Sequence, residues 1–406
     1  MTDIIVKHSY GHMRHFCHTP GRGICFCNMT DAHITGYDVL LPNGQKDYDV
    51  TIDDSDIIHL ICQDGEGNIV YIKNESGKWE KYIILKSKVS DPYLKDFNVF
   101  CTGNLISVIY AVEHKGKRLL SHQMLESDKV PIAIDYAIGE FSCTKFENDI
   151  YLFYTNSNGI SGWRRFLWDT KNWSDFNVVS KETLKNPCIY VNESVHITAV
   201  TQEDKVIYLS QAKESILADN ARRPIIMQDT NGLYIMWEQL NDSKAWASIS
   251  TDDGDNFLPP TEFMSGKFVP LKLFGLKTTS FEQWGARYCY GYIKDNIISL
   301  FLLSNYLKVS KSPPNKPIFE AKIDHDIEFT KLKLRIQQMN DTMTDIDFRL
   351  SMLERMINDT EHTEKQSVSE PDTEQSTDSI ENPEINSEES EIENPENTPE
   401  EKNTQS

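Results

Sequence analysis

The chain has 406 residues, of which 39% are hydrophobic and 25% charged, with a formal net charge of −21. This length suggests two or three structural units, and the negative charge argues against general nucleic-acid binding, which needs a basic surface to displace counterions. No run of about 18 apolar residues marks a membrane span, and no secretion signal is visible at the N-terminus. We therefore expect synthesis in the cytoplasm, with delivery to a surface or coat by another route left open.

The eight cysteines are dispersed and lie mostly within strand-like apolar runs. Thiols placed in this way are more often small core residues in a reducing compartment than a disulfide framework. Residues 8–33 also contain histidines, so metal binding is an alternative for this segment, but the spacing matches no structural zinc signature. The sequence predicts no metal site and no cofactor. The residues concerned are His8, His12, His15, Cys17, His18, Cys25, Cys27 and His33.

A sequence pattern typical of a β-hairpin recurs along the first 310 residues. Each copy has a turn rich in Asn, Asp or Gly, an alternating apolar strand, a second turn and a second strand. The six clear copies follow one another at 38 to 48 residues, except for a last interval of 65. The first strands begin at Ile58, Ile106, Ile150, Val195, Leu233 and Ile298, and a weaker copy begins at Ile24.

Alternation over five or six residues is typical of half-buried strands, and short polar links are typical of hairpins. Hairpins repeated at about 45 residues match the length of a four-stranded propeller blade. The sequence therefore predicts an all-β head over residues 1–310, a six- or seven-bladed β-propeller. Seven blades are favoured because the first copy is short and the last interval is long. A pair of packed β-sheets is the alternative fold.

One stretch, residues 250–257, matches a known turn motif directly after the strand-like run AWASIS. It reads S-x-D-x-G-x-x-F and resembles the Asp box, or BNR repeat, of sialidase-like β-propellers, which joins the third and fourth strands of a blade. We expect Asp252 to accept backbone N–H bonds from the turn, Gly254 to permit positive φ, and Phe257 to cap the hairpin. In those families the motif lies away from the active site, so it supports the fold and not an activity. The motif residues are Ser250, Asp252, Gly254 and Phe257.

The resemblance implies which residues an active sialidase would contain. Three arginines clamp a carboxylate, a glutamate activates a tyrosine nucleophile, and an aspartate acts as acid and base. The Arg-Ile-Pro motif expected before the first blade is absent, so we predict a non-catalytic member and keep a divergent sialidase-like glycosidase or lyase as the alternative. The candidates for clamp and nucleophile are Arg22, Arg223 and Arg287 with Tyr288 or Tyr290 and Glu238.

Two segments, residues 161–168 and 284–288, combine aromatic rings with guanidinium groups. Flat rings pack against sugar faces or peptide side chains, and arginine supplies directional donors. We predict that such residues bind a glycan or protein ligand, although aromatic residues that fill the core between blades are the alternative. The predicted ligand-binding residues are Trp163, Arg164, Arg165, Arg223, Trp284, Arg287 and Tyr288.

A proline linker over residues 311–322 separates the head from a heptad pattern in residues 323–358. Apolar residues there follow an unbroken 3-4 spacing, which predicts a coiled coil that joins two or three chains. An amphipathic helix packed on the head is the alternative. Joined heads would gain avidity for a multivalent ligand. The seam consists of Phe329, Leu332, Ile336, Met339, Met343, Ile346, Leu350, Leu353 and Ile357.

The last segment, residues 359–406, is rich in Glu, Ser, Thr, Asn, Pro and Gln. Residues 361–406 carry 15 acidic residues and two lysines, so most of the net charge of the chain belongs to this tail. Such a composition buries too little apolar surface to fold, and we predict disorder. The sequence as a whole thus predicts a non-enzymatic, oligomeric binding module. A structural coat or scaffold protein, in which stalk and tail matter more than a pocket, is the further alternative.

Overall fold

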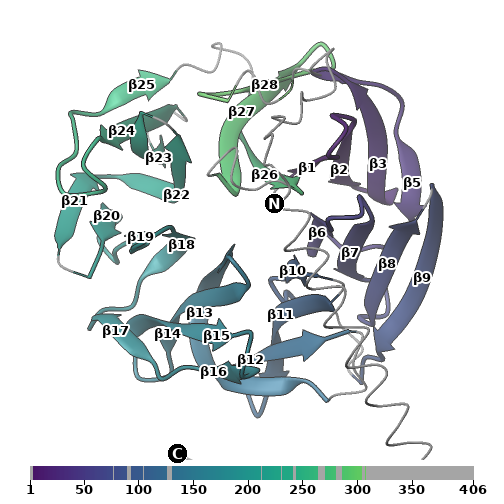
Figure 1. Ribbon diagram of the computed structural model, residues 1–406, viewed down its shortest axis with the longest axis horizontal. Coiled ribbons are helices and arrows are strands. Elements are labelled where there is room, and N and C mark those ends of the chain that lie inside the picture. The colour runs from purple at the N-terminus through teal and green to yellow at the C-terminus, as the bar shows by residue number, and fades with distance from the viewer. Residues whose placement is uncertain are drawn as a thin grey trace, which may run out of the picture. The chain divides into compact units, whose positions relative to one another are not determined.

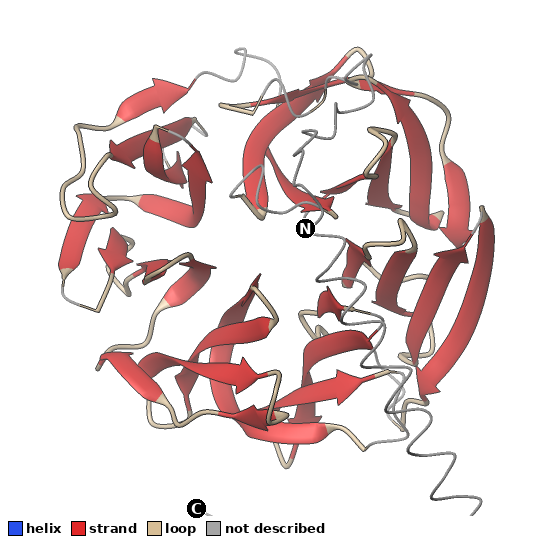
Figure 2. Ribbon diagram, viewed as in Figure 1, coloured by secondary structure: helices blue, strands red, loops and turns tan. Residues whose placement is uncertain are grey.

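The computed structural model describes residues 3–75, 77–88, 93–103, 105–125, 130–211, 213–229, 231–240, 244–263, 270–279, 286–303 and 307. All regular structure in these ranges is β-strand (Figure 2). Among these residues we find no helix with the length and apolar character needed to cross a membrane. The chain divides into compact units at residues 1–317 and 318–406. The predicted linker, coiled coil and tail lie outside the described residues.

Three sheets of the first unit each contain four antiparallel strands in sequence order. The first is β6 (Tyr48–Ile52), β7 (Ile58–Gln63), β8 (Ile69–Glu75) and β9 (Lys78–Leu85). The second is β18 (Lys185–Val191), β19 (Val195–Val200), β20 (Val206–Leu209) and β21 (Glu214–Ala218). The third is β22 (Ala221–Asp229), β23 (Gly232–Gln239), β24 (Ala245–Ser250) and β25 (Thr261–Phe263).

One larger sheet joins two such groups through the 15-residue strand β13 (Ile132–Phe146). The first part of β13 pairs with β12, and the remainder pairs with β14, so that one strand ends one group and begins the next. The other strands are β10 (Asn98–Thr102), β11 (Leu105–His114), β12 (Lys117–Met124), β14 (Asp149–Asn156), β15 (Ser161–Leu167), β16 (Asn172–Trp173) and β17 (Asn177–Ser180).

The remaining sheet joins the two ends of the unit. Strand β1 pairs in parallel with β26, and β28 pairs with β4, although the paired segments lie far apart in sequence. Its strands are β1 (Asp3–Lys7), β2 (Met13–Thr19), β3 (Gly23–Thr30), β4 (His33–Ile34), β5 (Asp38–Leu41), β26 (Lys272–Thr278), β27 (Tyr288–Lys294) and β28 (Ile297–Leu300).

These sheets are arranged around a common centre, and the first strand of each group lies nearest to it (Figure 1). This is the arrangement of a β-propeller. The recurring strands of the sequence begin within one residue of their predicted positions, at β7, β11, β14, β19, β23 and β28. Except for β28, however, these are the second strands of their groups. The predicted pattern therefore began one strand too late. Three of the preceding inner strands, β13, β18 and β22, contain register shifts that interrupt the alternation of side chains.

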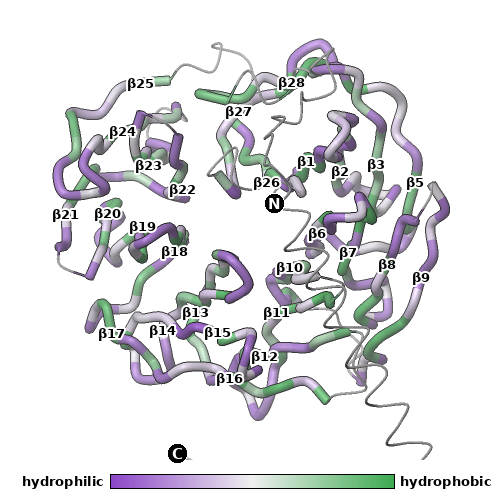
Figure 3. Tube along the Cα trace, in the orientation of Figure 1, coloured by the Kyte–Doolittle hydropathy of each residue, from purple (hydrophilic) through white to green (hydrophobic). Residues whose placement is uncertain are grey.

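The core lies between neighbouring sheets. Hydrophobic residues occur in strands all round the ring (Figure 3), and the fully buried strands show that both faces of a sheet can pack on its neighbours. Phe153 of β14 packs with Ile189 and Ile197 of the next sheet, and Ile61 of β7 packs with Val99 of β10. Every residue of β7 and β19 is buried, whereas most residues of the outer strand β9 are at least partly exposed. Each sheet thus depends on its neighbours for stability.

Two sheets repeat a buried hydrogen-bonded triad. In each, a histidine near the start of the second strand contacts a tyrosine of the third strand and an Asp or Asn from the turn after the first strand. Such links satisfy buried polar groups that would otherwise cost free energy. The contacts are His59 Nδ1 to Tyr71 Oη at 2.7 Å, His59 Nε2 to Asp53 Oδ2 at 3.2 Å, His196 Nδ1 to Tyr208 Oη at 2.7 Å, and His196 Nε2 to Asn192 Oδ1 at 3.0 Å.

We predict that Tyr208→Phe lowers the free energy of unfolding by about 1–3 kcal/mol, the cost of leaving a buried polar group unsatisfied. His196 and Tyr208 are both fully buried, so water does not readily replace the lost hydroxyl. Urea unfolding followed by circular dichroism measures the change. Tyr82→Phe on the exposed outer strand is the control, with an expected change within about 0.5 kcal/mol. A Tyr208→Phe chain as stable as the unmodified one would mean that His196 finds another partner.

Candidate functional site

Two cavities lie at opposite ends of the inner strands. The strand-end cavity has a volume of about 700 Å³ and is lined by the last residues of β6, β10, β13, β18 and β26 and by the turns that follow several of them. The strand-start cavity has a volume of about 420 Å³ and is lined by the first residues of the same strands and of β22. Lys277 lines both cavities. The centre of the ring is therefore hollow at both ends, with charged side chains between them.

These charged side chains form the central ion cluster, which we define as Asp49, Lys277 and Arg287. Lys277 Nζ lies 3.0 Å from Asp49 Oδ1, and Arg287 Nη2 lies 3.6 Å from Asp49 Oδ2. Asp49 Oδ2 also accepts the backbone N–H of Val99 at 2.9 Å. Burial lowers the pKa of Lys277, while the Asp49 carboxylate opposes this effect. One buried carboxylate thus serves two cations and a backbone amide.

Arg287 is held in place but is only partly satisfied. Its Nη2 donates to Asn98 Oδ1 at 2.6 Å, and its guanidinium lies 5.0 Å from the ring centre of Phe100. Its side chain is 9% exposed. Among the described residues, Nε and Nη1 have no hydrogen-bond partner. Both atoms are covered by the surrounding protein and have almost no accessible surface, and buried donors are costly when they are unpaired.

The lining of the strand-end cavity combines rings with charges. Phe100, Phe146 and Tyr190 contribute aromatic side chains. Lys145 and the two cations of the central ion cluster are buried or half-buried, whereas Asp54 and Glu147 at the rim are exposed. Burial lowers the pKa of Lys145, whose Nζ donates to the carbonyl of Cys101 at 2.5 Å. The size of this cavity is within the range of small-molecule sites, and about half of its lining residues are charged residues or threonines.

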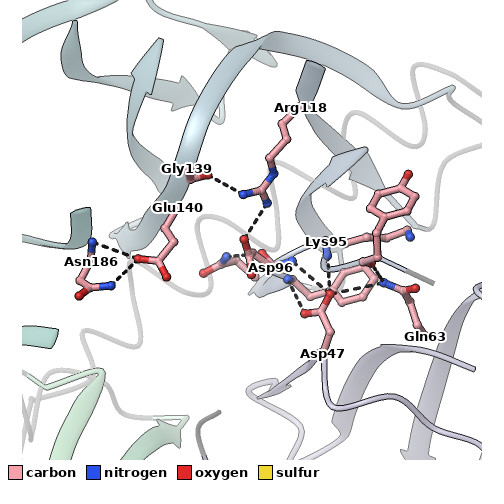
Figure 4. A network of polar contacts seen from close by, with 11 residues as sticks. Asp47, Gln63, Lys95, Asp96, Arg118, Gly139, Glu140 and Asn186 are labelled. Carbon is pink, nitrogen blue, oxygen red and sulfur yellow. Dashed lines mark hydrogen bonds and ion pairs between the residues drawn. The ribbon is translucent and has the colours of Figure 1, made fainter. Parts of the chain in front are cut away.

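In contrast, the polar side chains around the strand-start cavity are engaged with one another (Figure 4). The carboxylate of Asp47 accepts the backbone N–H groups of Lys95 at 2.5 Å and Asp96 at 3.2 Å. Burial raises the pKa of Asp47, and these backbone hydrogen bonds oppose that effect. Asp96 in turn accepts Arg118 Nη2 at 2.7 Å, and Arg118 Nη1 donates to the Gly139 carbonyl at 2.5 Å.

The same network continues to the next sheet. Glu140 Oε2 accepts the backbone N–H of Asn186 at 3.0 Å and its side-chain amide at 2.6 Å, and both residues are labelled in Figure 4. Ser142 Oγ accepts the backbone N–H of Ile189 at 3.2 Å. Strands β1 and β26 pair in a ladder, whereas the other neighbouring inner strands of the described ranges do not. These side chains therefore satisfy backbone groups that would otherwise be unpaired. They join adjacent sheets, which leaves them less suited to holding a ligand.

The proposed catalytic set does not gather at one site. Arg22 lies on an exposed turn and donates to the Tyr37 carbonyl at 2.9 Å. It lines neither cavity, Arg223 lines the strand-start cavity, and Arg287 lines the strand-end cavity. The three arginines therefore do not form a shared carboxylate clamp, and the sequence-based grouping of these three was wrong.

The candidate nucleophile pair is also engaged elsewhere. Glu238 accepts hydrogen bonds from Arg222, at 2.7 Å, and from Arg223. Burial raises the pKa of Glu238, but these two arginines outweigh burial and hold it below its usual value. The Tyr290 hydroxyl donates to the Arg223 carbonyl at 2.6 Å, and Tyr288 lines the strand-start cavity. The glutamate is thus an ion-pair partner, and neither tyrosine is shown beside it as a nucleophile.

Trp163, Arg164 and Arg165 lie on β15, the third strand of its group, and line neither cavity. Trp163 packs against the Tyr151 ring at 5.7 Å as part of the core between sheets. Arg165 forms an ion pair with Asp149 at 2.5 Å. All three are half-buried rather than exposed. Trp284 lies outside the described residues.

The turn at residues 250–257 begins at the end of β24 and precedes β25, the fourth strand of its sheet. Asp252 Oδ1 accepts the backbone N–H of Asn256 at 2.8 Å, and Ser250 Oγ accepts that of Gly254 at 2.8 Å. Gly254 has φ of +96°, and a Cβ there would lie 2.0 Å from the Tyr208 hydroxyl. Phe257 packs on the Tyr208 ring, with centres 4.9 Å apart. The phenylalanine therefore contacts the neighbouring sheet, whereas we had expected it to cap its own hairpin.

The cysteines and histidines near the N-terminus take part in hydrogen bonds and core packing. His15 Nδ1 lies 2.9 Å from the Tyr37 hydroxyl, and Cys25 and Cys27 are buried. All eight cysteines are free thiols. Within the described ranges, no three His, Cys, Asp or Glu side chains are grouped closely enough to hold a metal ion.

Sequence reasoning missed most of the strand-end cavity. Lys145 and Lys277, which line this cavity, and Asp49, which pairs with Lys277, lie on three different strands far apart in the chain. The sequence signal for these three residues is weak, because each is a single charged residue within a strand pattern that continues on both sides. Such residues are also common on solvated strand faces, so this signal does not identify a site without the fold.

Comparisons with known proteins give structural similarity only. No protein-family model matches the chain, and no curated protein matches it significantly in sequence. AofleA from Arthrobotrys oligospora is 8% identical with a TM-score of 0.41, covering 65% of this chain and 87% of that one. The Aleuria aurantia lectin, solved with alpha-methyl-L-fucoside, is 8% identical with a TM-score of 0.43, over 65% and 95%. An ulvan lyase from a polysaccharide lyase family is 10% identical with a TM-score of 0.45, over 74% and 93%. Similarity at this level does not assign the chain to any of these families.

Proposed function

We propose that the head is a non-enzymatic glycan-binding module and that a sugar residue occupies the strand-end cavity. The observation that carries this proposal is the lining of a cavity of about 700 Å³ by three aromatic side chains together with charged and hydroxyl groups. Sugars present apolar C–H faces that pack on rings and hydroxyls that exchange hydrogen bonds with charged and polar groups. Both kinds of partner line this cavity.

A binding role is favoured over catalysis by the state of the candidate catalytic groups. Glu238 is held by two arginines, and the Tyr290 hydroxyl is bound to a backbone carbonyl. A general base must be free to take a proton from its partner. These contacts instead support a structural role at the start of β22.

We further propose that the head has seven blades. The inner strands are then β1, β6, β10, the second part of β13, β18, β22 and β26, with β26–β28 forming a blade beside β1–β5. The heptad seam of residues 323–358 is proposed to join two or three heads. Linked heads raise the effective concentration of a second site for a multivalent glycan.

The test is a glycan array probed with the full-length chain. We expect Phe146→Ala to weaken binding to the recognised glycan by about tenfold or more, because the loss of one stacked ring costs roughly 1–3 kcal/mol. Isothermal calorimetry with the best glycan measures the change. Tyr82→Ala, which removes a ring 48% exposed on the outer strand β9, is the matched control and should bind normally.

Two outcomes would contradict the proposal. The first is an array without any recognised glycan, and the second is binding that Phe146→Ala leaves unchanged. Turnover of a fluorogenic glycoside by the full-length chain would favour the glycosidase alternative instead.

A further inference from the structure

We propose that Cys17 and Cys25 form an oxidative modification site, at which hydrogen peroxide converts the two thiols to a disulfide between strands β2 and β3. Neither cysteine lines one of the two cavities, so this site does not depend on the proposed function. The product is a covalent link within the sheet that joins the two ends of the unit.

The pairing of β2 with β3 places the two thiols side by side. The strands pair over seven positions without a register shift, and Cys17 lies directly opposite Cys25. Directly opposed residues of an antiparallel pair share one face and have Cα atoms about 4.5–5.5 Å apart. A disulfide needs a Cα separation of about 4.4–6.8 Å. The bond can therefore form without a change in strand pairing.

A third thiol on the same face, Cys27, is out of register for such a bond. It lies opposite His15, so it is diagonal to Cys17, at a Cα distance of about 7–8 Å. Cys25 and Cys27 are two positions apart on one strand, with roughly parallel side chains and Cα atoms about 6.5–7 Å apart. Neither arrangement brings two Cβ atoms to the separation of about 3.5–4.5 Å that a disulfide requires. Cys17 and Cys25 are therefore the expected pair.

The two sulfur atoms are also directed toward the same end of the hairpin. Cys17 Sγ lies 3.8 Å from Thr19 Oγ1, and Cys25 Sγ donates to the Gly23 carbonyl at 3.8 Å. Thr19 and Gly23 are themselves directly opposite, so both thiols lean toward one neighbouring pair of residues. Burial raises the pKa of Cys17, and the nearby Asp3 and Cys25 add to the increase. The thiols are thus close to each other, and Cys17 carries little thiolate at neutral pH.

The difference in burial sets the order of the reaction. Cys17 is 9% exposed and Cys25 is 0% exposed, so peroxide meets Cys17 first. The Cys17 thiolate attacks one peroxide oxygen and the O–O bond breaks, which gives a sulfenic acid and hydroxide. The Cys25 sulfur then forms the S–S bond and displaces the hydroxyl group as water. In sum, two thiols and one hydrogen peroxide give one disulfide and two water molecules, slowly because the thiolate is scarce.

The experiment exposes the folded full-length chain to hydrogen peroxide for a prolonged period, blocks the remaining thiols with iodoacetamide and digests the chain with trypsin without reduction. Trypsin cleaves after Arg22, which separates Cys17 from Cys25. We expect mass spectrometry to find the peptides of residues 15–22 and 23–46 linked, and dithiothreitol to release them. The melting temperature should rise by about 4 °C on oxidation, because the link restricts the unfolded chain.

Two variants identify the partner of Cys17. Cys27→Ser leaves Cys25 as the single thiol of its peptide, and the link should persist. Cys25→Ala leaves Cys27 in that peptide, and both the link and the rise in melting temperature should be lost. If Cys25→Ala does not fold, Cys17→Ser removes the same bond at the less buried position.

Three results would overturn the inference. The first is a link that survives in Cys25→Ala, which would identify Cys27 as the partner. The second is the absence of a link in the folded chain under conditions that link the same peptides in the chain unfolded by urea. The third is oxygen addition at Cys17 without a link, which would show that Cys25 does not reach the sulfenic acid.

Discussion

Replacing Asp49 with alanine should lower the free energy of unfolding by about 3–5 kcal/mol, the range measured when one partner of a buried ion pair is removed. Asp49 is 6% exposed and is the carboxylate partner of two buried cations. Its loss removes the carboxylate that pairs with both Lys277 and Arg287, and it removes the acceptor for the Val99 amide. Urea unfolding of the full-length chain, followed by circular dichroism, measures the effect.

Asp204→Ala is the matched control, because Asp204 forms an exposed pair with Lys185 at 3.1 Å. Exposed pairs are worth at most about 1 kcal/mol, so this variant should stay close to the unmodified chain. If Asp49→Ala were as mild as the control, the two cations would have to be neutral or solvated.

The second large effect is a loss of stability in acid that arises from His122. This residue is 1% exposed, and its ring meets Phe166 edge-on, with ring centres 4.4 Å apart. Burial, aided by the charge of Lys171, lowers the pKa of His122 from 6.5 to about 4. The folded chain therefore binds the proton more weakly than the unfolded chain, whose histidine titrates near its ordinary pKa.

The direction of the pH effect on stability follows from this difference in pKa between the folded and unfolded chains. Above about pH 6.5 His122 is neutral in both states, so it does not lower the free energy of unfolding. Between about pH 6.5 and pH 4 the unfolded chain binds more protons than the folded chain, so the free energy of unfolding falls as the pH falls. Since one pKa unit corresponds to about 1.4 kcal/mol, His122 should cost about 3 kcal/mol as pH falls through this window. His8, whose pKa burial also lowers to about 4, should add to the loss.

Urea unfolding at about pH 7 and about pH 4 tests the prediction, and His122→Leu should reduce the difference between the two free energies by about 3 kcal/mol. Leu120→Ala on the same strand is the control. It removes buried apolar surface without removing a titrating group, so it should destabilise equally at both pH values. An unchanged pH dependence in His122→Leu would show that this histidine takes up its proton as readily in the folded chain as in the unfolded chain.

Local sequence signals located the strands well. Ile58 and Val195 begin β7 and β19, and Leu233 lies at the second position of β23. These strands are long, apolar and bounded by Asn, Asp and Gly turns, so their pattern needs no distant partner to be recognised. The inner strand β6, with Asp49 among its five residues, has a weaker pattern and was not recognised as the start of its group.

The site was predicted less well than the fold. Of the predicted ligand-binding residues, Arg287 lines the strand-end cavity, whereas Trp163 and Arg165 line neither cavity. Trp163 and Arg165 were chosen because rings and guanidinium groups adjoin in the sequence. Trp163 and Arg165 are two positions apart, so they lie on the same face of β15, where Trp163 packs against the Tyr151 ring and Arg165 pairs with Asp149. Chain proximity was therefore a poor guide to which groups share a cavity.

The sequence by itself determined what depends on neighbouring residues: the all-β character, the starts of the strands and the turn chemistry around Asp252 and Gly254. Only the tertiary structure decided which charges meet at the centre, because β1 pairs with β26 and brings Lys277 beside Asp49 from more than 200 residues away. The physical reason is that strand pattern is a local property, whereas a buried ion cluster forms where separate strands converge. Its composition depends on how the sheets are arranged around their common centre.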